Sequence, residues 1–148
     1  DNVTGLMWEV KTDDDGLRDK DHTYTWYNSD SNTNGGNAGR ENGGTCADAG
    51  NCDTEKYVVS VNAIGICGHN DWRMPAESEL QSIFNSARTN PTIDTTYFPS
   101  TVSDYYWSSS PYADNIDVAW DVHFGFSGVN SSAKYGSYYV RLVRPDSN

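Results

Sequence analysis

The chain has 148 residues, a formal net charge of −11 and 13% aromatic residues. This length predicts a single domain over residues 1–148. The ten basic residues are scattered along the chain, whereas binding to nucleic acid or to an anionic membrane requires them in clusters. We therefore expect no nucleic-acid partner. No apolar stretch approaches the ~18–20 residues of a membrane span, so we expect no direct membrane insertion.

A strand is predicted first, over Leu6–Val10. The next segment, residues 11–53, is almost entirely polar, with Tyr24, Trp26 and Tyr27 as packing anchors. A loop this long inside a compact domain is usually functional or locally packed. We expect its 28–45 portion to contribute to a binding surface.

Four aspartates cluster early in this polar segment: Asp13, Asp15, Asp19 and Asp21. Calcium takes about six to eight oxygen ligands, often from closely spaced carboxylates around a glycine turn. The complete EF-hand pattern is absent, because Tyr24 stands where that pattern requires a glutamate. The two interpretations are a calcium site, with calcium as the one possible cofactor, and a solvated acidic turn.

Two helices are predicted next. Asp53 is a good N-cap for a helix over residues 54–64, and Gly65 suits a left-handed stop. Val58, Val61 and Ile64 would form its inward face. Pro75 begins a second helix over residues 76–87, whose apolar residues recur at helical spacing: Leu80, Ile83, Phe84 and Ala87.

The three cysteines are Cys46, Cys52 and Cys67. Cys46 and Cys52 lie in a loop rich in glycine and asparagine and could close a small ring. A Cys46–Cys67 pair remains possible if the loop folds back, whereas the helix between Cys52 and Cys67 disfavours that pair. We expect Cys67 to be buried. One disulfide and one buried thiol fit an extracellular or cell-surface protein.

From Tyr105 onward the pattern alternates with the period of a strand. It predicts strands over Ala119–Phe124 and Tyr138–Arg144, with glycines marking the turns. A strand at each end, helices after the first and further strands before the last favour an α+β fold. We expect the first and last strands to pair.

The segment 105–139 is rich in Tyr, Asn, Ser and Asp. Tyr gives a large contact area with few rotatable bonds, and Ser and Asn give adaptable hydrogen bonds. The alternative interpretation is an ordinary sheet with Tyr and Ser at solvent-facing positions. The predicted ligand-binding residues are Tyr105, Tyr112, Asn115, Asp117, Trp120, His123, Asn130, Tyr135 and Tyr138.

Short motifs in a fixed order extend over nearly the whole chain: Thr4–Trp8, Asp71–Pro75, Glu79–Leu80, Tyr97–Pro99, Tyr106–Ser110, Ala119–Trp120 and Val140–Arg144. This ordered set resembles the C-terminal domain of Legionella collagen-like protein. The resemblance implies a C-type-lectin-like fold with two helices, a small sheet and long loops. It also implies an adhesin-like role and a homo-oligomer, a trimer in the best-known member. That member binds sulfated glycosaminoglycans, a ligand that does not suit an acidic chain.

Catalysis is not expected. The three histidines form no metal pair at helical spacing, and a buried Cys67 would be inert. The formylglycine-generating relatives use cysteines late in the chain, and none follows Cys67. We expect a non-catalytic extracellular binding and adhesion module that recognises a glycan or a cell-surface protein. The alternative is a structural, self-associating subunit or tip domain of an extracellular assembly.

Overall fold

The computed structural model describes residues 1–146. Its helices are α1 (Thr54–Ile64), a 3-10 turn η1 (Ile66–Gly68) and α2 (Glu77–Gln81). Its strands are β1 (Leu6–Trp8), β2 (Tyr24–Thr25), β3 (Tyr105–Pro111), β4 (Val118–His123), β5 (Gly128–Ala133), β6 (Ser137–Tyr138) and β7 (Val143–Pro145). None of these helices has the length and apolar character needed to cross a membrane.

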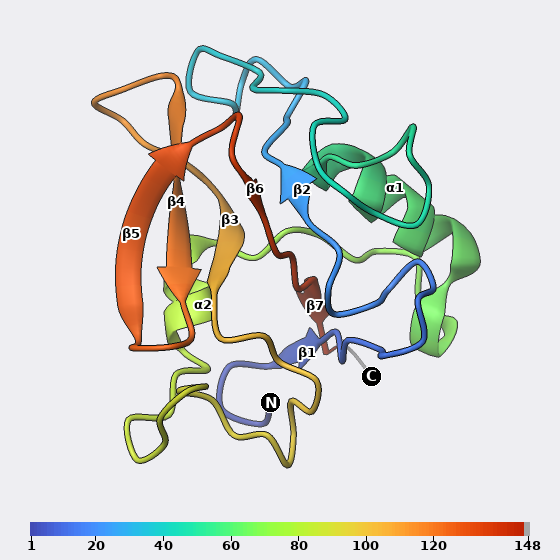
Figure 1. Ribbon diagram of the computed structural model, residues 1–148, viewed down its shortest axis with the longest axis vertical. Coiled ribbons are helices and arrows are strands. Elements are labelled where there is room, and N and C mark those ends of the chain that lie inside the picture. The colour runs from blue at the N-terminus through green and yellow to red at the C-terminus, as the bar shows by residue number, and fades with distance from the viewer. Residues whose placement is uncertain (147–148) are drawn as a thin grey trace.

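All the strand pairs are antiparallel. β1 pairs with β7, β2 pairs with β6, and β3, β4 and β5 form a three-stranded sheet in that order (Figure 1). The pairing of β1 with β7 brings the two ends of the described chain together. The predicted α+β class, the small antiparallel sheet and the paired terminal strands are confirmed, while the likeness to C-type lectins stays a prediction.

Helix α1 has the bounds that its caps predict. The carboxylate of Asp53 accepts the backbone N–H of Lys56 at 2.9 Å, which satisfies one free donor of the first turn. Gly65 adopts φ 67°, and its N–H donates to the carbonyl of Val61 at 3.1 Å. The helix therefore begins and ends where local hydrogen bonding replaces the helical ladder.

Two expectations about this helix are wrong. Val61 is buried and Val58 packs partly buried against the core as predicted, but Ile64 is 59% exposed and the buried Tyr57 completes the inward face. Cys67 is free and exposed rather than buried. The left-handed turn at Gly65 and the positive φ of Cys67 (55°) direct the chain away from the core at this point.

Helix α2 is shorter than predicted, ending at Gln81 instead of continuing to residue 87. Ile83 and Phe84 bond to carbonyls three residues back, so the chain continues as tight turns. These turns preserve the spacing of the apolar residues, and Ile83 is still buried. The N-terminus is only half capped: Glu79 accepts the N–H of Ala76, and Ala76 has no side-chain oxygen to return the bond.

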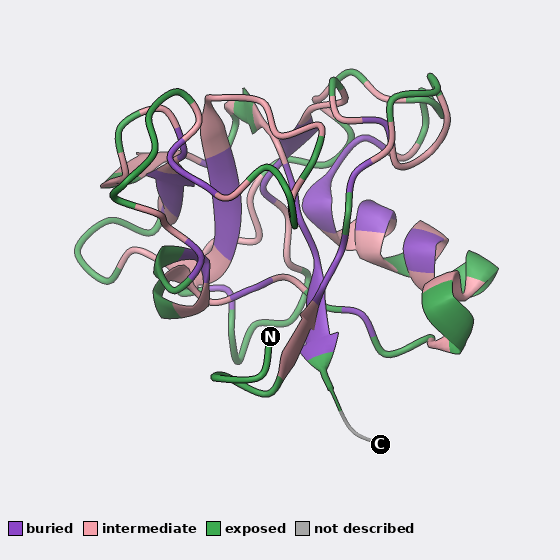
Figure 2. Ribbon diagram, turned by 90° about the horizontal axis from the view of Figure 1, so that it is seen from below, coloured by how far each residue is buried: buried purple, intermediate pink, exposed green. Residues whose placement is uncertain are grey.

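The three-stranded sheet lies between two apolar cores. One core joins Tyr24, Trp26, Tyr57 and Trp72 to Trp107 of β3. The other lies on the opposite face and joins Trp8, Leu80, Tyr106, Val122 and Phe124, among others. Figure 2 shows the buried residues concentrated in the strands and on one side of α1. Because the sheet is fixed from both faces, it is a rigid support for the loops at its ends.

The predicted strand over residues 138–144 is split, because Val140, Arg141 and Leu142 turn into the core between β6 and β7. Arg141 donates to the backbone oxygen of Glu9 at 2.6 Å, and the buried carboxylate of Glu9 accepts the hydroxyl of Tyr57 at 2.6 Å. Burial raises the pKa of Glu9, but Lys11, the Tyr57 hydroxyl, the N–H of Leu142 and Arg18 together hold this pKa below its usual range. This network ties the first strand to α1 and to the C-terminal segment.

The Trp72–Arg73 motif has structural contacts. Arg73 forms two bonds of 2.8 Å with the carboxylate of Glu79 in α2. Asp71 accepts a hydrogen bond from the guanidinium of Arg144 in β7 at 2.6 Å. Both pairs connect the segment before α2 to neighbouring elements. These structural contacts account for Asp71 and Arg73 without a role in ligand binding.

Candidate functional site

The register of the sheet decides which predicted residues share a face. Trp107 lies opposite Asp121, and Asp121 lies opposite Asn130. Tyr105 lies opposite His123, two residues along the same strands. Since side chains alternate with a period of two, all five point to one face of the sheet.

A continuous string of aromatic rings runs over this face. His123 lies edge-on to Tyr105 with ring centres 4.5 Å apart, and Tyr105 lies 5.4 Å from Tyr138. Tyr138 then lies 5.0 Å from the buried Trp107. Three of the nine predicted ligand-binding residues are therefore in contact, although they belong to β3, β4 and β6.

Phe126 extends the string into solvent, and the sequence analysis missed it. Its ring stacks on His123 at 4.2 Å with an interplanar angle of 17°, yet the residue is 63% exposed. Its place in the Gly125–Gly128 turn was the available signal, because an aromatic residue in a glycine-bounded turn has little to bury it. We call Tyr105, His123, Phe126 and Tyr138 the ring string.

The remaining predicted residues lie elsewhere. Tyr112 and Trp120 form a pair on the opposite side of the sheet, with ring centres 4.9 Å apart. Asn115 and Asp117 are exposed in the turn between β3 and β4, and Tyr135 is 68% exposed between β5 and β6. The nine predicted residues thus do not form a single patch. Asn130 lies on the same face of the sheet as the ring string, whereas five residues lie on other surfaces: Tyr112, Asn115, Asp117, Trp120 and Tyr135.

The 28–45 loop is fixed against the sheet by Lys134. This lysine is buried, and its ammonium donates to the backbone oxygens of Asn34 at 3.0 Å, Asn37 at 2.7 Å and Ile116 at 2.6 Å. It also lies 4.4 Å from the ring centre of Trp26. Its three donors therefore connect the loop to the turn between β3 and β4.

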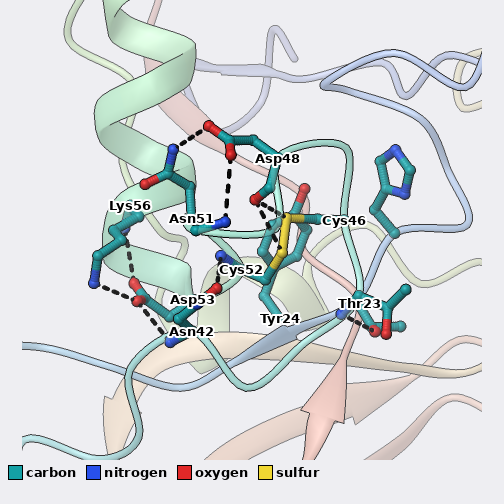
Figure 3. Close-up of a disulfide and its surroundings, with 12 residues drawn as sticks. Thr23, Tyr24, Asn42, Cys46, Asp48, Asn51, Cys52, Asp53 and Lys56 are labelled. Carbon is teal, nitrogen blue, oxygen red and sulfur yellow. Dashed lines mark hydrogen bonds and ion pairs between the residues drawn. A yellow bond between two sulfur atoms is a disulfide. The ribbon is translucent and has the colours of Figure 1, made fainter.

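A disulfide closes the end of the same polar segment. Cys46 and Cys52 are bonded, and the backbone oxygen of Asp48 lies 3.2 Å and 3.3 Å from their sulfur atoms (Figure 3). The N–H of Cys52 donates to the side chain of Asn42 at 2.9 Å. The small ring predicted from the sequence is therefore present and is fixed to the preceding loop.

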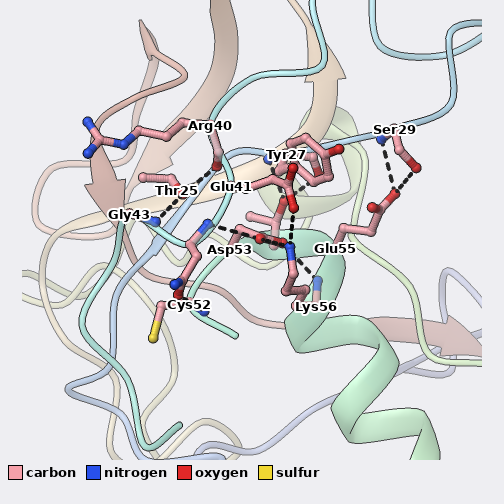
Figure 4. Close-up of polar contacts among 12 residues, drawn as sticks. Thr25, Tyr27, Ser29, Arg40, Glu41, Gly43, Cys52, Asp53, Glu55 and Lys56 are labelled. Carbon is pink, nitrogen blue, oxygen red and sulfur yellow. Dashed lines mark hydrogen bonds and ion pairs between the residues drawn. The ribbon is translucent and has the colours of Figure 1, made fainter. Parts of the chain in front are cut away.

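Asp53 joins this loop to α1. Besides capping the helix, its carboxylate accepts the N–H of Asn42 at 3.0 Å (Figure 3) and the ammonium of Lys56 at 2.7 Å (Figure 4). Lys56 also bonds Glu41 at 2.8 Å, and these carboxylates hold its pKa above the usual range. The base of the loop is thus held by backbone and ionic contacts together.

Gly39 allows the loop to lie close to β2. It adopts φ 93°, and a Cβ at this position would lie 2.2 Å from the backbone oxygen of Trp26. Only glycine combines this positive φ with so close an approach to Trp26 without displacing the backbone. The loop is accordingly an ordered part of the domain.

The acidic cluster is only partly assembled. Ligand atoms of Asp13, Asp19 and Asp21 lie within 4.8 Å of one another, and Asp15 is not in this group. The carboxylate of Asp19 already accepts the N–H groups of Asp14, Asp15 and Asp21 at 2.8–2.9 Å, which lowers its pKa. The ammonium of Lys20 lies 3.0 Å from Asp21 and 3.9 Å from Asp13. A cation binding here would compete with Lys20.

Asp121 is an unusual carboxylate beneath the ring string. It is fully buried, and neither of its oxygens has a well-formed hydrogen bond within residues 1–146. Burial raises its pKa to about 6, and the nearby side chains of Ser132 and Asn130 oppose this rise. The ionised carboxylate of Asp121 therefore destabilises the folded state at neutral pH.

A large groove lies away from the ring string. Its volume is about 790 Å³, and it lies between β1, the end of α2 and the connector before β3, lined by Trp8, Ile83, Phe84 and Phe98 among others. A second groove of about 210 Å³ lies beside α1. Neither of these two grooves is lined by a cysteine or a histidine.

Comparison with known proteins places the chain in one family. No curated protein and no solved structure matches it. The model of the family described as Lcl C-terminal domain matches residues 1–144, nearly the whole chain. The chain therefore belongs to the Lcl C-terminal domain family, the family that its ordered motifs resemble.

Proposed function

We propose that this domain is a non-catalytic extracellular binding module that recognises a glycan or another cell-surface ligand through the ring string. The observation that carries the proposal is the stacking of Phe126 on His123, because it leaves an aromatic residue 63% exposed in a turn at the end of the sheet. Folding alone gives little reason for an apolar ring to remain in water. A ligand that covers it would remove this exposed surface.

The chemistry around the string suits a polyhydroxylated ligand. Flat ring faces can stack on the apolar face of a sugar, and Asn130 on the same face of the sheet offers an amide for hydroxyl groups. The carboxylate of Asp104 lies 4.0 Å from His123 and is 44% exposed. These acidic and amide groups, in a chain of net charge −11, favour a neutral or cationic glycan over a sulfated one.

Two further observations support the extracellular assignment. The Cys46–Cys52 disulfide is a bond that persists in oxidising compartments. The resemblance to Legionella collagen-like protein implies an adhesin-like role. Recognition of a ligand outside the cell is consistent with both.

A glycan array and a cell-binding assay test the proposal with three proteins. We expect Phe126→Ala to lose binding by tenfold or more, a loss of about 1.4 kcal/mol. Tyr97→Ala is the matched control, because Tyr97 is an aromatic residue 72% exposed beside the large groove. Unchanged binding by Phe126→Ala, or no binding by the native domain in either assay, would rule out recognition through the ring string.

The second candidate function is a self-associating subunit of an extracellular assembly. It is favoured by one specific observation, the position of β5 at the outer edge of the three-stranded sheet. In Figure 1, β5 is the leftmost strand of the fold.

A further inference from the structure

The two edges of the three-stranded sheet differ. Along β3, the N–H of Trp107 donates to Tyr139 at 2.9 Å, and the N–H of Tyr139 donates to Tyr105 at 3.1 Å, so this edge is covered. β5 forms the other edge. The N–H of Lys134 donates to the oxygen of Asp117 at 2.9 Å, which fixes the alternation of hydrogen bonds along the β4–β5 pair.

That alternation shows which backbone groups are free. Residues 128, 130 and 132 are the partners that bond to β4, so residues 129, 131 and 133 point their N–H groups away from the sheet. Among residues 1–146, no backbone acceptor pairs with the N–H of Val129, Ser131 or Ala133 across this edge. The sheet therefore ends on a row of unpaired N–H donors, while the backbone oxygen of Ala133 accepts the N–H of Gly136 at 2.9 Å.

Natural proteins usually protect such an edge with charges, proline or a bulge. β5 has none of these: its sequence is Gly-Val-Asn-Ser-Ser-Ala, and its register with β4 is continuous over six residue pairs. No Asp, Glu, Lys or Arg occurs from residue 122 to residue 133. The side chains are small, so they leave the backbone accessible.

The strand is also complementary to itself. In an antiparallel pair of two copies with Ser131 opposite Ser131, Val129 of each copy lies opposite Ala133 of the other. The same two-fold arrangement brings the turn that carries Phe126 beside the turn that carries Tyr135, and these aromatic residues are 63% and 68% exposed. An isologous contact requires this kind of self-complementarity.

We propose that β5 pairs with β5 of a second copy of this chain, which joins the two sheets into one continuous six-stranded sheet. Six-stranded sheets are common in proteins. The pairing would also cover the β5 edge, which is exposed in each separate copy. The two copies each have a net charge of −11 and repel each other, but the paired segment is uncharged. Salt should therefore strengthen the association by screening the remaining charges.

This inference deepens the second candidate function and does not depend on ligand recognition. Its failure would leave the ring-string proposal standing, and the binding test with Phe126→Ala would still decide that proposal. The pairing is tested separately, because its hydrogen-bonding groups are backbone atoms of residues 129–133 and its variants leave the four rings unchanged.

Sedimentation velocity on the intact chain tests the pairing. The native protein should shift with concentration from 16.4 kDa toward twice that mass, and more readily as salt is raised. Ser131→Lys places like charges opposite each other at the two-fold axis and should raise the dissociation constant about tenfold or more. Val59→Lys makes the same change of net charge at a residue 64% exposed on α1, and should leave the constant almost unchanged.

Ser131→Pro is a second variant, since proline is tolerated in an edge strand where its N–H would face solvent. It should abolish the dimer and keep the thermal unfolding midpoint of the native monomer. Exchange of the Ser131 amide with solvent should slow as protein concentration rises. A monomer at every concentration up to about 200 µM, a range that covers micromolar affinities, would overturn the proposal. A dimer that neither Ser131 variant weakens, or that Val59→Lys weakens equally, would also overturn it.

Discussion

Replacing Asp121 by Asn is expected to stabilise the domain at neutral pH and to change its stability little near pH 4. Asp121 is buried without a well-formed hydrogen bond, and burial raises its pKa from 3.8 to about 6. The folded protein therefore binds this proton more tightly than the unfolded chain does. The contribution of the protonated carboxyl is fully present below pH 3.8 and is lost as pH rises through about 6.

The pKa values set the size of the effect. Full conversion of this pKa difference gives about 3 kcal/mol of lost stability above pH 6. Local relaxation of the fold around the buried carboxylate reduces the figure to about 2 kcal/mol. The Asp121→Asn substitution would avoid this cost, because an amide of nearly the same shape is uncharged at every pH in the range.

Urea unfolding from pH 4 to pH 8 measures the effect. Asp114→Asn is the control, because Asp114 is exposed in the turn between β3 and β4 and the substitution makes the same change of net charge. We expect the free energy of unfolding of Asp121→Asn to exceed that of the native protein at pH 7, and the two to converge near pH 4. An Asp121→Asn protein no more stable than the native one at pH 7, or an equal gain from Asp114→Asn, would refute the reasoning.

Three further predictions concern the polar segment and the loop. Lys134→Met should lower the free energy of unfolding by about 3 kcal/mol, because three hydrogen bonds from a buried ammonium to backbone oxygens are lost. A decrease below about 0.5 kcal/mol in urea unfolding would contradict the stabilising role of these bonds. Replacing Cys46 and Cys52 by Ser should cost about 2 kcal/mol for a loop of this length, and an unchanged melting temperature would argue against that figure. If the acidic cluster binds calcium, the ion should raise the melting temperature of Lys20→Gln more than that of the native protein, since Lys20 competes for the same carboxylates. Identical melts with calcium and with chelator in both proteins would refute the calcium hypothesis.

Features set by local chemistry could be predicted from the sequence. Asp53 and Gly65 determine the two ends of α1 through bonds within a few residues, and both predictions are confirmed. The second helix could not be bounded in the same way. Tight turns after Gln81 satisfy the same apolar spacing as a helix, so periodicity alone does not distinguish them.

Features set by distant contacts could not be predicted. Lys134 fixes a loop about one hundred residues earlier in the chain, and no sequence pattern predicts that contact. The ring string joins three strands whose register is determined only when the sheet forms. For the same reason, the nine predicted residues could be chosen by type, but their division between the ring string and other surfaces required the fold.

The most direct test of ligand recognition is nuclear magnetic resonance mapping of the strongest glycan-array hit on the isotope-labelled domain. The proposal predicts that the largest shifts fall on Tyr105, His123 and Phe126, with little change at Ile83 and Phe98 in the large groove. Shifts concentrated in that groove, with the ring string unaffected, would contradict it.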